Sequence, residues 1–476
     1  METIINILEF LWVLLQVILI FNFLILVHEW GHFLAARWRG LHVEKFQIWF
    51  GPAIWKKTYN GVQYGIGCIP AGGFVALPQM APMEMLEGKT DGEKPLAPIS
   101  PLDKIIVAFA GPLFSFGLAC VFALVVWGVK KPMTEPATSS VIGYIAPEMP
   151  AAQSGLKIGD RITAIDGSPV SVFAAPVDSV IERIVFSEGD TIEVTVERDG
   201  EEKPLTFSVG FQKEERTGIF NRSDTRKIGI GPAFTPLVEQ LIPGSPAEQA
   251  GIQEGDIIRQ LNSEKVYTLG QIVDWVKENP TGEAAITVER GGKLLPDVFT
   301  MTPAKPVYPE KADPVLGMVW GEVTTLERPN PIGEIKQSST ALFRMLSALF
   351  SKKSDIDVSH MSGPLMIGKS YFQMLKGEDG WRMALWFSIL LNVNLAILNL
   401  MPLPVLDGGH ITMALIEGVT RRPVRFRVLE YIQAGAALAL IGLMLYISVL
   451  DGKGIAKDAS EPEPEAKVPP TEYRFK

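Results

Sequence analysis

Two histidines and a glutamate in one short segment carry the clearest chemical signal in the chain. The segment reads His28-Glu29-Trp30-Gly31-His32, so the two imidazoles are four residues apart. On an α-helix, positions i and i+4 lie on one face, and two imidazoles there can occupy two corners of a tetrahedral zinc site. A glutamate beside them can take a proton from a water molecule at the metal. We therefore predict that His28 and His32 bind Zn2+ and that Glu29 is the catalytic base.

The motif lies at the end of a long apolar run, residues 4–27, which is long enough to cross a bilayer as a helix. Ionisable side chains are costly in a membrane helix and are usually retained there for a function. The simpler alternative is that these side chains form the polar end of a span and reach toward the interface. The chain has only five histidines, and such a chain rarely contains this pattern by chance, which favours the metal site.

A zinc hydrolase keeps three protein ligands and leaves the fourth position open, so the two histidines need a third partner. Asp407, in the segment Leu406-Asp407-Gly408-Gly409, follows another apolar run and is the first candidate. His410 and Glu417 are alternatives nearby in the sequence. His410 follows the two glycines and would need a different backbone path, so we rank it second.

The composition indicates a membrane protein of several parts. The 476 residues are 47% hydrophobic, and the mean hydropathy of +0.20 is high for a soluble chain. This length allows about two to four domains. The net charge of −9 gives no indication of nucleic-acid binding, and we expect no nucleic-acid partner. The two cysteines, Cys68 and Cys120, are too few and too far apart to imply a disulfide framework.

Four apolar segments are each predicted to form a transmembrane helix. Their ranges are 1–36, 104–131, 381–410 and 429–450. The third differs from the others because it contains three asparagines and ends in the broken stretch Met401-Pro402-Leu403-Pro404.

Lysines and arginines indicate the orientation, because they collect in loops on the cytoplasmic side of a membrane. The 37–104 loop carries eight of them, and the short 407–428 loop carries four arginines. We therefore expect both loops, and with them the metal site, on the cytoplasmic side. Four spans then place both termini and the long central segment outside the cytoplasm.

The central segment contains an internal repeat with an offset of 96 residues. Its copies begin at Pro150-Ala151 and Pro246-Ala247, and each reaches a Gly-Asp pair, Gly159-Asp160 or Gly255-Asp256. Two related small domains, 137–212 and 226–305, are therefore predicted in tandem. The pattern resembles the bacterial PDZ domain, which implies binding of peptide termini or other extended segments by strand addition. The alternative is a spacer or size filter without a ligand.

Three further segments have recognisable character. In the 37–103 loop, Asn60-Gly61 between strand-like residues predicts a β-hairpin. The 330–353 segment has apolar residues near helical spacing, so it is either an amphipathic helix on the membrane lipid surface or a helix packed on a neighbouring domain. The 451–476 tail is rich in Glu, Pro and Lys and is expected to be disordered.

Two motifs together resemble the site-2 protease family. They are His28-Glu29-x-x-His32 in the first span and Asn399-Leu400-Met401-Pro402-Leu403-Pro404-Val405-Leu406-Asp407-Gly408 at the end of the third. The tandem PDZ-like insertion between spans two and three narrows the resemblance to the bacterial branch that includes the regulators of sigma-E. The likeness extends over nearly the whole chain, to about Leu450.

The resemblance implies zinc with His28, His32 and Asp407 as ligands and Glu29 as the base. It also implies that Asn394 and Asn399 handle the substrate near the scissile bond, although these amides could instead join neighbouring helices. The family's 43–78 region is a membrane-associated β element that can receive an unwound substrate as a strand. Substrates in this family are single-span membrane proteins, such as trimmed anti-sigma factors and remnant signal peptides, in the bacterial inner membrane.

One departure from the family pattern lies close to the motifs. Ser115 follows Ala110-Gly111-Pro112 at a position where the bacterial relatives usually carry Asn.

The expected fold is an α-helical multi-pass membrane protein with four transmembrane helices, a membrane-associated β element, and two small α+β PDZ-like domains between helices two and three. The expected activity is intramembrane endopeptidase cleavage. The first alternative is a membrane-bound PDZ scaffold with an inactive metal site. The second is another membrane metallopeptidase that takes a glutamate as its third ligand and cuts in solvent.

Overall fold

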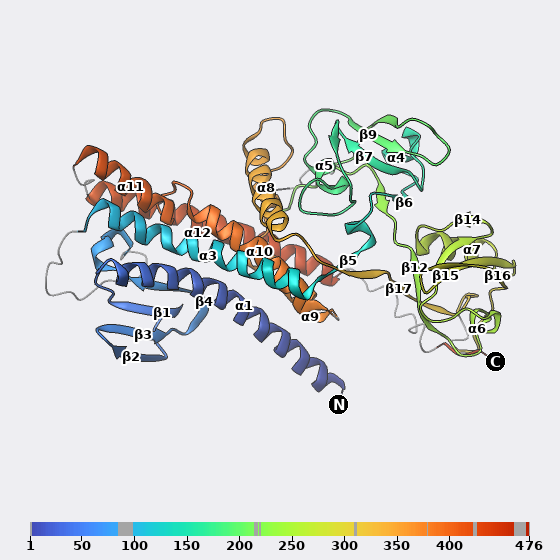
Figure 1. Ribbon diagram of the computed structural model, residues 1–476, viewed down its shortest axis with the longest axis horizontal. Helices are drawn as coiled ribbons and strands as arrows, with labels where there is room; N and C mark the ends of the chain where they lie inside the picture. The colour runs from blue at the N-terminus through green and yellow to red at the C-terminus, as the bar shows by residue number, and fades with distance from the viewer. Residues whose placement is uncertain are drawn as a thin grey trace. The chain divides into compact units, whose positions relative to one another are not determined.

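The computed structural model describes residues 2–83, 99–213, 218, 220–308, 312–377, 379–421, 426–460 and 473–475 (Figure 1). The chain divides into two compact units. Unit 1 contains residues 1–131, 328–344 and 361–453, and unit 2 contains residues 132–327, 345–360 and 454–476.

Helices dominate unit 1. They are α1 (Glu2–Trp38), α3 (Pro101–Val129), α9 (Pro364–Lys376), α10 (Gly380–Asn399), α11 (Asp407–Thr420) and α12 (Phe426–Ser460). Parts of α1, α3, α10 and α12 are long and apolar enough to cross a membrane, which agrees with the four predicted spans. The helix α8 (Pro331–Phe350) passes from unit 1 into unit 2.

Helix α3 lies at the centre of unit 1 and packs against α1, α10 and α11 (Figure 1). It begins with Ser100 as N-cap, whose side chain accepts from the Asp103 N–H, and with proline at its first position. A Cβ on Gly31 of α1 would lie only 2.5 Å from the Ala110 carbonyl oxygen of α3. Glycine at this position therefore allows the backbones of α1 and α3 to approach closely.

The third and fourth apolar segments differ in extent from the predicted ranges. Helix α10 ends at Asn399 and a separate helix, α11, begins at Asp407, so the predicted 381–410 segment is broken before its metal-ligand candidate. The prolines at 402 and 404 explain the break, since proline cannot continue the hydrogen bonding of a helix. Helix α12 continues to Ser460, so the first part of the 451–476 tail is helical where we expected disorder.

A four-stranded sheet follows α1. Its strands are β1 (Lys45–Phe50), β2 (Trp55–Tyr59), β3 (Val62–Ile66) and β4 (Ile69–Ala76), in the order β2-β3-β1-β4. The hairpin predicted at Asn60-Gly61 is confirmed, because β2 and β3 pair antiparallel and both turn residues have positive φ. The edge strand β4 packs against α1, which places it beside the histidine motif. The 3-10 helix η1 (Pro78–Met83) follows β4.

Unit 2 contains two domains with the same order of elements, as the sequence repeat predicts. The first repeat domain (residues 140–232) consists of β6 (Ile142–Ile145), α4 (Pro150–Ser154), β7 (Arg161–Ile165), β8 (Ser168–Pro169), α5 (Val180–Val185), β9 (Ile192–Glu197), β10 (Leu205–Val209) and β11 (Ile230–Pro232). The second repeat domain (residues 236–322) consists of β12 (Pro236–Leu241), α6 (Pro246–Ala250), β13 (Ile257–Leu261), β14 (Glu264–Lys265), α7 (Leu269–Glu278), β15 (Ala284–Arg290), β16 (Lys293–Met301) and β17 (Met318–Glu322).

A late strand closes each repeat domain. Strand β11 pairs with β6, and β17 pairs with β12, so both domains use residues beyond the expected ends at 212 and 305. The repeated Gly-Asp pairs also have matching roles: Asp160 accepts from Arg198, and Asp256 accepts from Arg290, each through two hydrogen bonds. Beside these domains lie the 3-10 helix η2 (Glu135–Ala137) and the strands β5 (Lys131–Thr134) and β18 (Thr324–Glu327).

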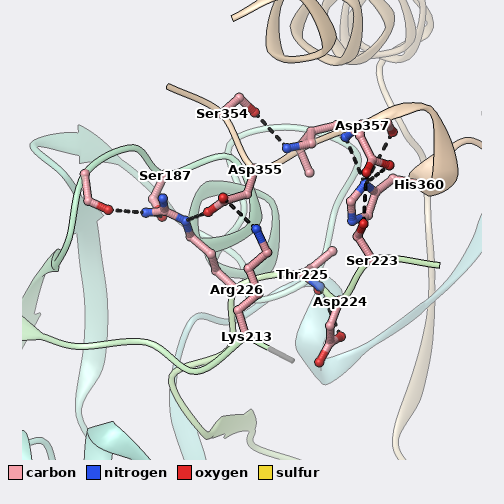
Figure 2. A network of polar contacts seen from close by, with 12 residues as sticks. Ser187, Lys213, Ser223, Asp224, Thr225, Arg226, Ser354, Asp355, Asp357 and His360 are labelled. Carbon is pink, nitrogen blue, oxygen red and sulfur yellow. Dashed lines mark hydrogen bonds and ion pairs between the residues drawn. The ribbon is translucent and has the colours of Figure 1, made fainter. Parts of the chain in front are cut away.

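A polar network fixes the segment after α8 to the first repeat domain (Figure 2). Asp355 accepts from Arg226 and from Lys213, each at 2.6 Å, and Arg226 also donates to the Gly189 carbonyl. The two cationic partners hold the pKa of Asp355 below its usual range, with the Lys213 hydrogen bond as the largest lowering cause. The 3-10 helix η3 (Val358–His360) ends this segment.

Candidate metal centre

Three side chains from two distant segments converge at the end of α1. His28 Nε2 and His32 Nε2 are 3.2 Å apart, and the Asp407 carboxylate presents Oδ2 to His28 at 3.3 Å and Oδ1 to His32 at 3.4 Å. All three residues are buried. Among the described residues, they form the one group of His, Cys, Asp or Glu side chains that could hold a metal ion.

The donor atoms fit a zinc ion. In a tetrahedral site with Zn–N bonds of about 2.0–2.1 Å, neighbouring ligand atoms are roughly 3.3 Å apart, close to the separation of the two imidazole nitrogens. Asp407 Oδ2 is buried without a hydrogen-bond partner, which is costly unless a cation or a proton satisfies it. Two imidazoles and a carboxylate are also the ligand types that Zn2+ prefers.

The far nitrogen of each imidazole is held by α3. His28 Nδ1 lies 3.0 Å from the Ser115 hydroxyl, and His32 Nδ1 lies 2.8 Å from the Val107 carbonyl oxygen. A carbonyl can only accept, so His32 carries its proton on Nδ1 and presents a lone pair at Nε2. Such outer contacts orient metal-binding histidines and set their tautomers. Ser115, which the sequence marked only as a departure from the family pattern, therefore has a structural role beside His28.

Helix α3 also supplies the space for the cluster. A Cβ on Gly111 would lie 2.2 Å from His32 Nε2 and 2.8 Å from His28 Nε2. Both distances are far below a normal contact, so only glycine leaves these nitrogens room at this position. We did not identify Gly111 from the sequence, although a glycine beside Pro112 within an apolar helix was visible.

Asp407 is positioned by the first turn of α11. It is the first residue of this helix, where the backbone N–H groups favour a negative charge. The glycines that follow let the start of α11 pass close to the preceding backbone, since a Cβ on Gly408 would lie 2.3 Å from the Leu400 carbonyl oxygen. Burial raises the pKa of Asp407, but His32 and His28 outweigh it and hold this pKa below its usual range.

Glu29 lies next to the ligands and faces strand β4. Its carboxylate interacts electrostatically with the Val75 backbone, and its Cγ lies 3.8 Å from the position that a Cβ on Gly73 would take. Glu29 is half-buried, whereas both neighbouring histidines of the motif are buried. The base candidate therefore lies between the metal-binding atoms and the edge of a sheet.

The other ligand candidates have different surroundings. Glu417 accepts a hydrogen bond from Lys104 at 2.7 Å, which engages its carboxylate elsewhere. His410 is half-buried on α11 and is not a member of the metal-binding group, and burial lowers the pKa of its imidazole. The geometry therefore favours Asp407, the first-ranked candidate.

The substrate-binding candidates lie on α10. Asn394 and Asn399 are half-buried, and Asn394 Oδ1 is buried without a hydrogen-bond partner. Asn392, two residues earlier, is fully buried and donates to the Ser388 carbonyl, so it joins turns of its own helix. Asn392 Oδ1 is also without a hydrogen-bond partner, so Asn394 differs from Asn392 in its half-buried position and not in having a free acceptor.

Comparisons with known proteins cover almost the whole chain. The model of peptidase family M50 matches residues 16–443. A Vibrio cholerae protein that carries zinc metalloprotease in its name is 30% identical over 451 residues, which is 89% of this chain and 94% of that protein. The regulator of sigma-E protease RseP of Escherichia coli is 29% identical over 467 residues, 92% of this chain and 97% of that protein.

A third relative gives the same result. The regulator of sigma E protease of Haemophilus influenzae is 30% identical over 461 residues, 91% of this chain and 97% of that protein. The matched range includes the histidine motif, Asp407 and the four candidate spans except the beginning of α1 and the end of α12. The chain therefore belongs to peptidase family M50, the site-2 proteases, and is a zinc metalloprotease of that type.

Proposed function

We propose that this chain is an intramembrane endopeptidase that cuts single-span membrane proteins within or near the bilayer. The observation that carries the proposal is the buried convergence of His28, His32 and Asp407 at the end of a helix that can cross a membrane. Zinc at this site would polarise a water molecule and the scissile carbonyl. Buried ionisable groups in such a helix are retained for function, which argues against a scaffold with an inactive metal site.

Glu29 performs the proton transfers in this mechanism. Its carboxylate lies beside the ligand nitrogens and takes a proton from the attacking water, then passes that proton to the leaving amine. Strand β4 helps to present the substrate. A helical peptide bond is shielded by its own hydrogen bonds, so the substrate must be extended before attack, and an edge strand can hold an extended segment by backbone pairing.

Asn394 of α10 supports the same step in this proposal. Its buried and unpartnered Oδ1 can accept from a backbone N–H of the extended substrate, and its amide can donate to a carbonyl. We propose Asn399, near the end of α10, as a second contact to the substrate.

The natural substrates we propose are membrane-tethered regulators, such as anti-sigma factors trimmed by another protease, and remnant signal peptides. The names of the Escherichia coli and Haemophilus influenzae relatives support a role in sigma-E regulation. The location we propose is the bacterial inner membrane, with the metal site toward the cytoplasm and with both termini and the repeat domains outside.

Cys68 offers a direct test of this orientation. It is an exposed free thiol in the loop between β3 and β4, which the topology places on the cytoplasmic side. In a Cys120→Ser background, a membrane-impermeant maleimide should label Cys68 only after the membrane is opened. Labelling of Cys68 in intact cells would show that the topology is the reverse of the one proposed.

The repeat domains act, in this proposal, as PDZ-like gates against bulky, uncut substrates. An apolar pocket in the first repeat domain supports a peptide-binding role, since it lies between α5 and the strand β11. Its lining includes Ile181, Ile184, Gly229 and Ile230. Removing residues 137–322, which include β17 of the second repeat domain, should make an intact substrate cleavable while zinc content stays unchanged; unaltered selectivity would contradict the gate.

The ligand assignment is tested by comparing two substitutions on α11. Asp407→Ala should lose zinc and cleavage of a tagged single-span substrate, whereas His410→Ala should keep both. Metal analysis and cleavage are measured on the same membrane preparations. Zinc retained in Asp407→Ala but lost in His410→Ala would identify His410 as the third zinc ligand.

A further inference from the structure

The end of the chain lies against the second repeat domain as an extended segment. The backbone N–H groups of Val307 and Tyr308 donate to the Arg474 carbonyl at 2.6 and 3.4 Å, and the Arg474 N–H donates to the Tyr308 carbonyl at 3.0 Å. Tyr308 and Arg474 thereby form an antiparallel β-bridge. Figure 1 marks this end of the chain beside α6. The contact is a backbone pairing of the kind that adds a strand to a domain.

The side chains of the segment alternate as expected for an extended strand. Arg474 points to solvent and is exposed, whereas Tyr473 and Phe475 are half-buried. Phe475 lines a pocket beside α6 and the end of β16. The other apolar side chains that line this pocket are Pro246, Ala250, Met301, Ala304 and Val307.

The acceptor side of the contact is anchored to the domain. Ala304 and Val315 pair by two backbone hydrogen bonds, which hold the segment that receives the tail. Gly317 lies under the ring, since a Cβ there would be 3.4 Å from Phe475 and 2.2 Å from Ser245. With φ at +85°, this position favours glycine, so the backbone leaves space beside the ring.

We propose that residues 304–308 form a strand-acceptor site whose tethered ligand is the chain's own segment 473–475, with the packing of the half-buried Phe475 ring beside Gly317 selecting an aromatic side chain. Backbone pairing supplies affinity in such sites, and the packing of alternate side chains supplies specificity. Another extended polypeptide with an aromatic residue can enter only by displacing the tail. The site lies on the α6 side of the second repeat domain and does not involve the metal centre, so its failure would leave the proposed protease function intact.

Hydrogen exchange on the full-length protein in detergent tests the contact. A ligand segment on the same chain has an effective concentration on the order of 1 mM, so a site with Kd on the order of 0.1 mM is filled about ten to one. The amides of Val307 and Tyr308, which donate to the Arg474 carbonyl, should therefore exchange about ten-fold faster in Phe475→Ala and in a variant lacking residues 461–476. Arg474→Ala is the matched control, because its side chain is exposed and its backbone contacts remain; its exchange should stay at the wild-type rate.

Adding the ligand back completes the test. A labelled peptide with the sequence of residues 471–476 should bind the shortened variant, restore its protection at Val307 and Tyr308, and bind the wild type about ten-fold more weakly because the tail competes. The same peptide with alanine in place of Phe475 should not bind. Unchanged exchange in the shortened variant, or equal binding of the two peptides, would overturn the proposal.

Discussion

Substituting Gly111 by alanine adds one methyl group at the point where α3 meets the metal-binding nitrogens. The new Cβ would lie 2.2 Å from His32 Nε2, and an ordinary contact begins at 3.4 Å, so the difference of about 1.2 Å must come from movement of the ring or of α3. Zinc sites tolerate deviations of only about 0.2 Å in their ligand distances. Gly111→Ala should therefore lose more zinc affinity than the roughly 10–100-fold typical of changes to the outer contacts of a metal site.

Gly117 provides the matched control on the same helix, because a Cβ there meets nothing within 4 Å. Alanine is favoured over glycine within a helix by about 1 kcal/mol, so neither substitution should weaken α3 by itself. Zinc per protein, measured by mass spectrometry after competition with a chelator, should fall in Gly111→Ala and stay at the wild-type value in Gly117→Ala. Wild-type zinc affinity in Gly111→Ala would show that α3 does not approach the ligands as described.

Two further predictions concern an outer contact of the metal site and the network of Figure 2. Ser115→Ala removes the hydroxyl beside His28 Nδ1 and should lower zinc affinity by about 10–100-fold, which chelator competition measures; unchanged affinity would show that the hydroxyl does not orient the ring. Asp355→Asn should lower the free energy of unfolding of unit 2 by about 1 kcal/mol at pH 7, because the ion pair with Arg226 and Lys213 is partly exposed and screened. The pKa of Asp355 is depressed in the folded chain, so this contribution is present above the unfolded pKa of about 3.9 and is lost as the pH falls further. Thermal unfolding of Asp355→Asn and wild type should therefore differ at pH 7 and converge as the pH falls below the folded-state pKa of Asp355, and a constant difference over this range would contradict the assignment.

The sequence predicted those site residues whose role follows from short-range spacing or from their place beside an apolar segment. The motif His28 to His32 needs only one helix face, and Asp407 was indicated by its place after an apolar segment. Ser115, Val107 and Gly111 could not be assigned, because their roles arise from contacts between α1 and α3 across 75 or more residues. Such pairings depend on how the helices pack and leave no periodic pattern in one sequence.

The fold was likewise predicted where short sequence patterns specify it and missed where it depends on contacts between distant residues. The Asn60-Gly61 turn and the repeat were readable because they are short patterns with fixed chemistry. Strands β11 and β17 were missed, since each is short and pairs with a strand from the beginning of its domain. The helix break after Asn399 had a local signal in two prolines, yet the apolar composition on either side made the segment read as one span.

The most direct test of the central claim separates metal binding from catalysis at Glu29. Glu29→Gln keeps the shape of the side chain but removes the proton acceptor, and loss of a general base typically costs about 10²–10⁴-fold in rate. Wild type and variant would be expressed with a tagged single-span substrate, and cleavage and zinc content would be measured on the same membranes. The account predicts that Glu29→Gln retains zinc and does not cut. Equal cleavage by both proteins would contradict the assignment of Glu29 as the base.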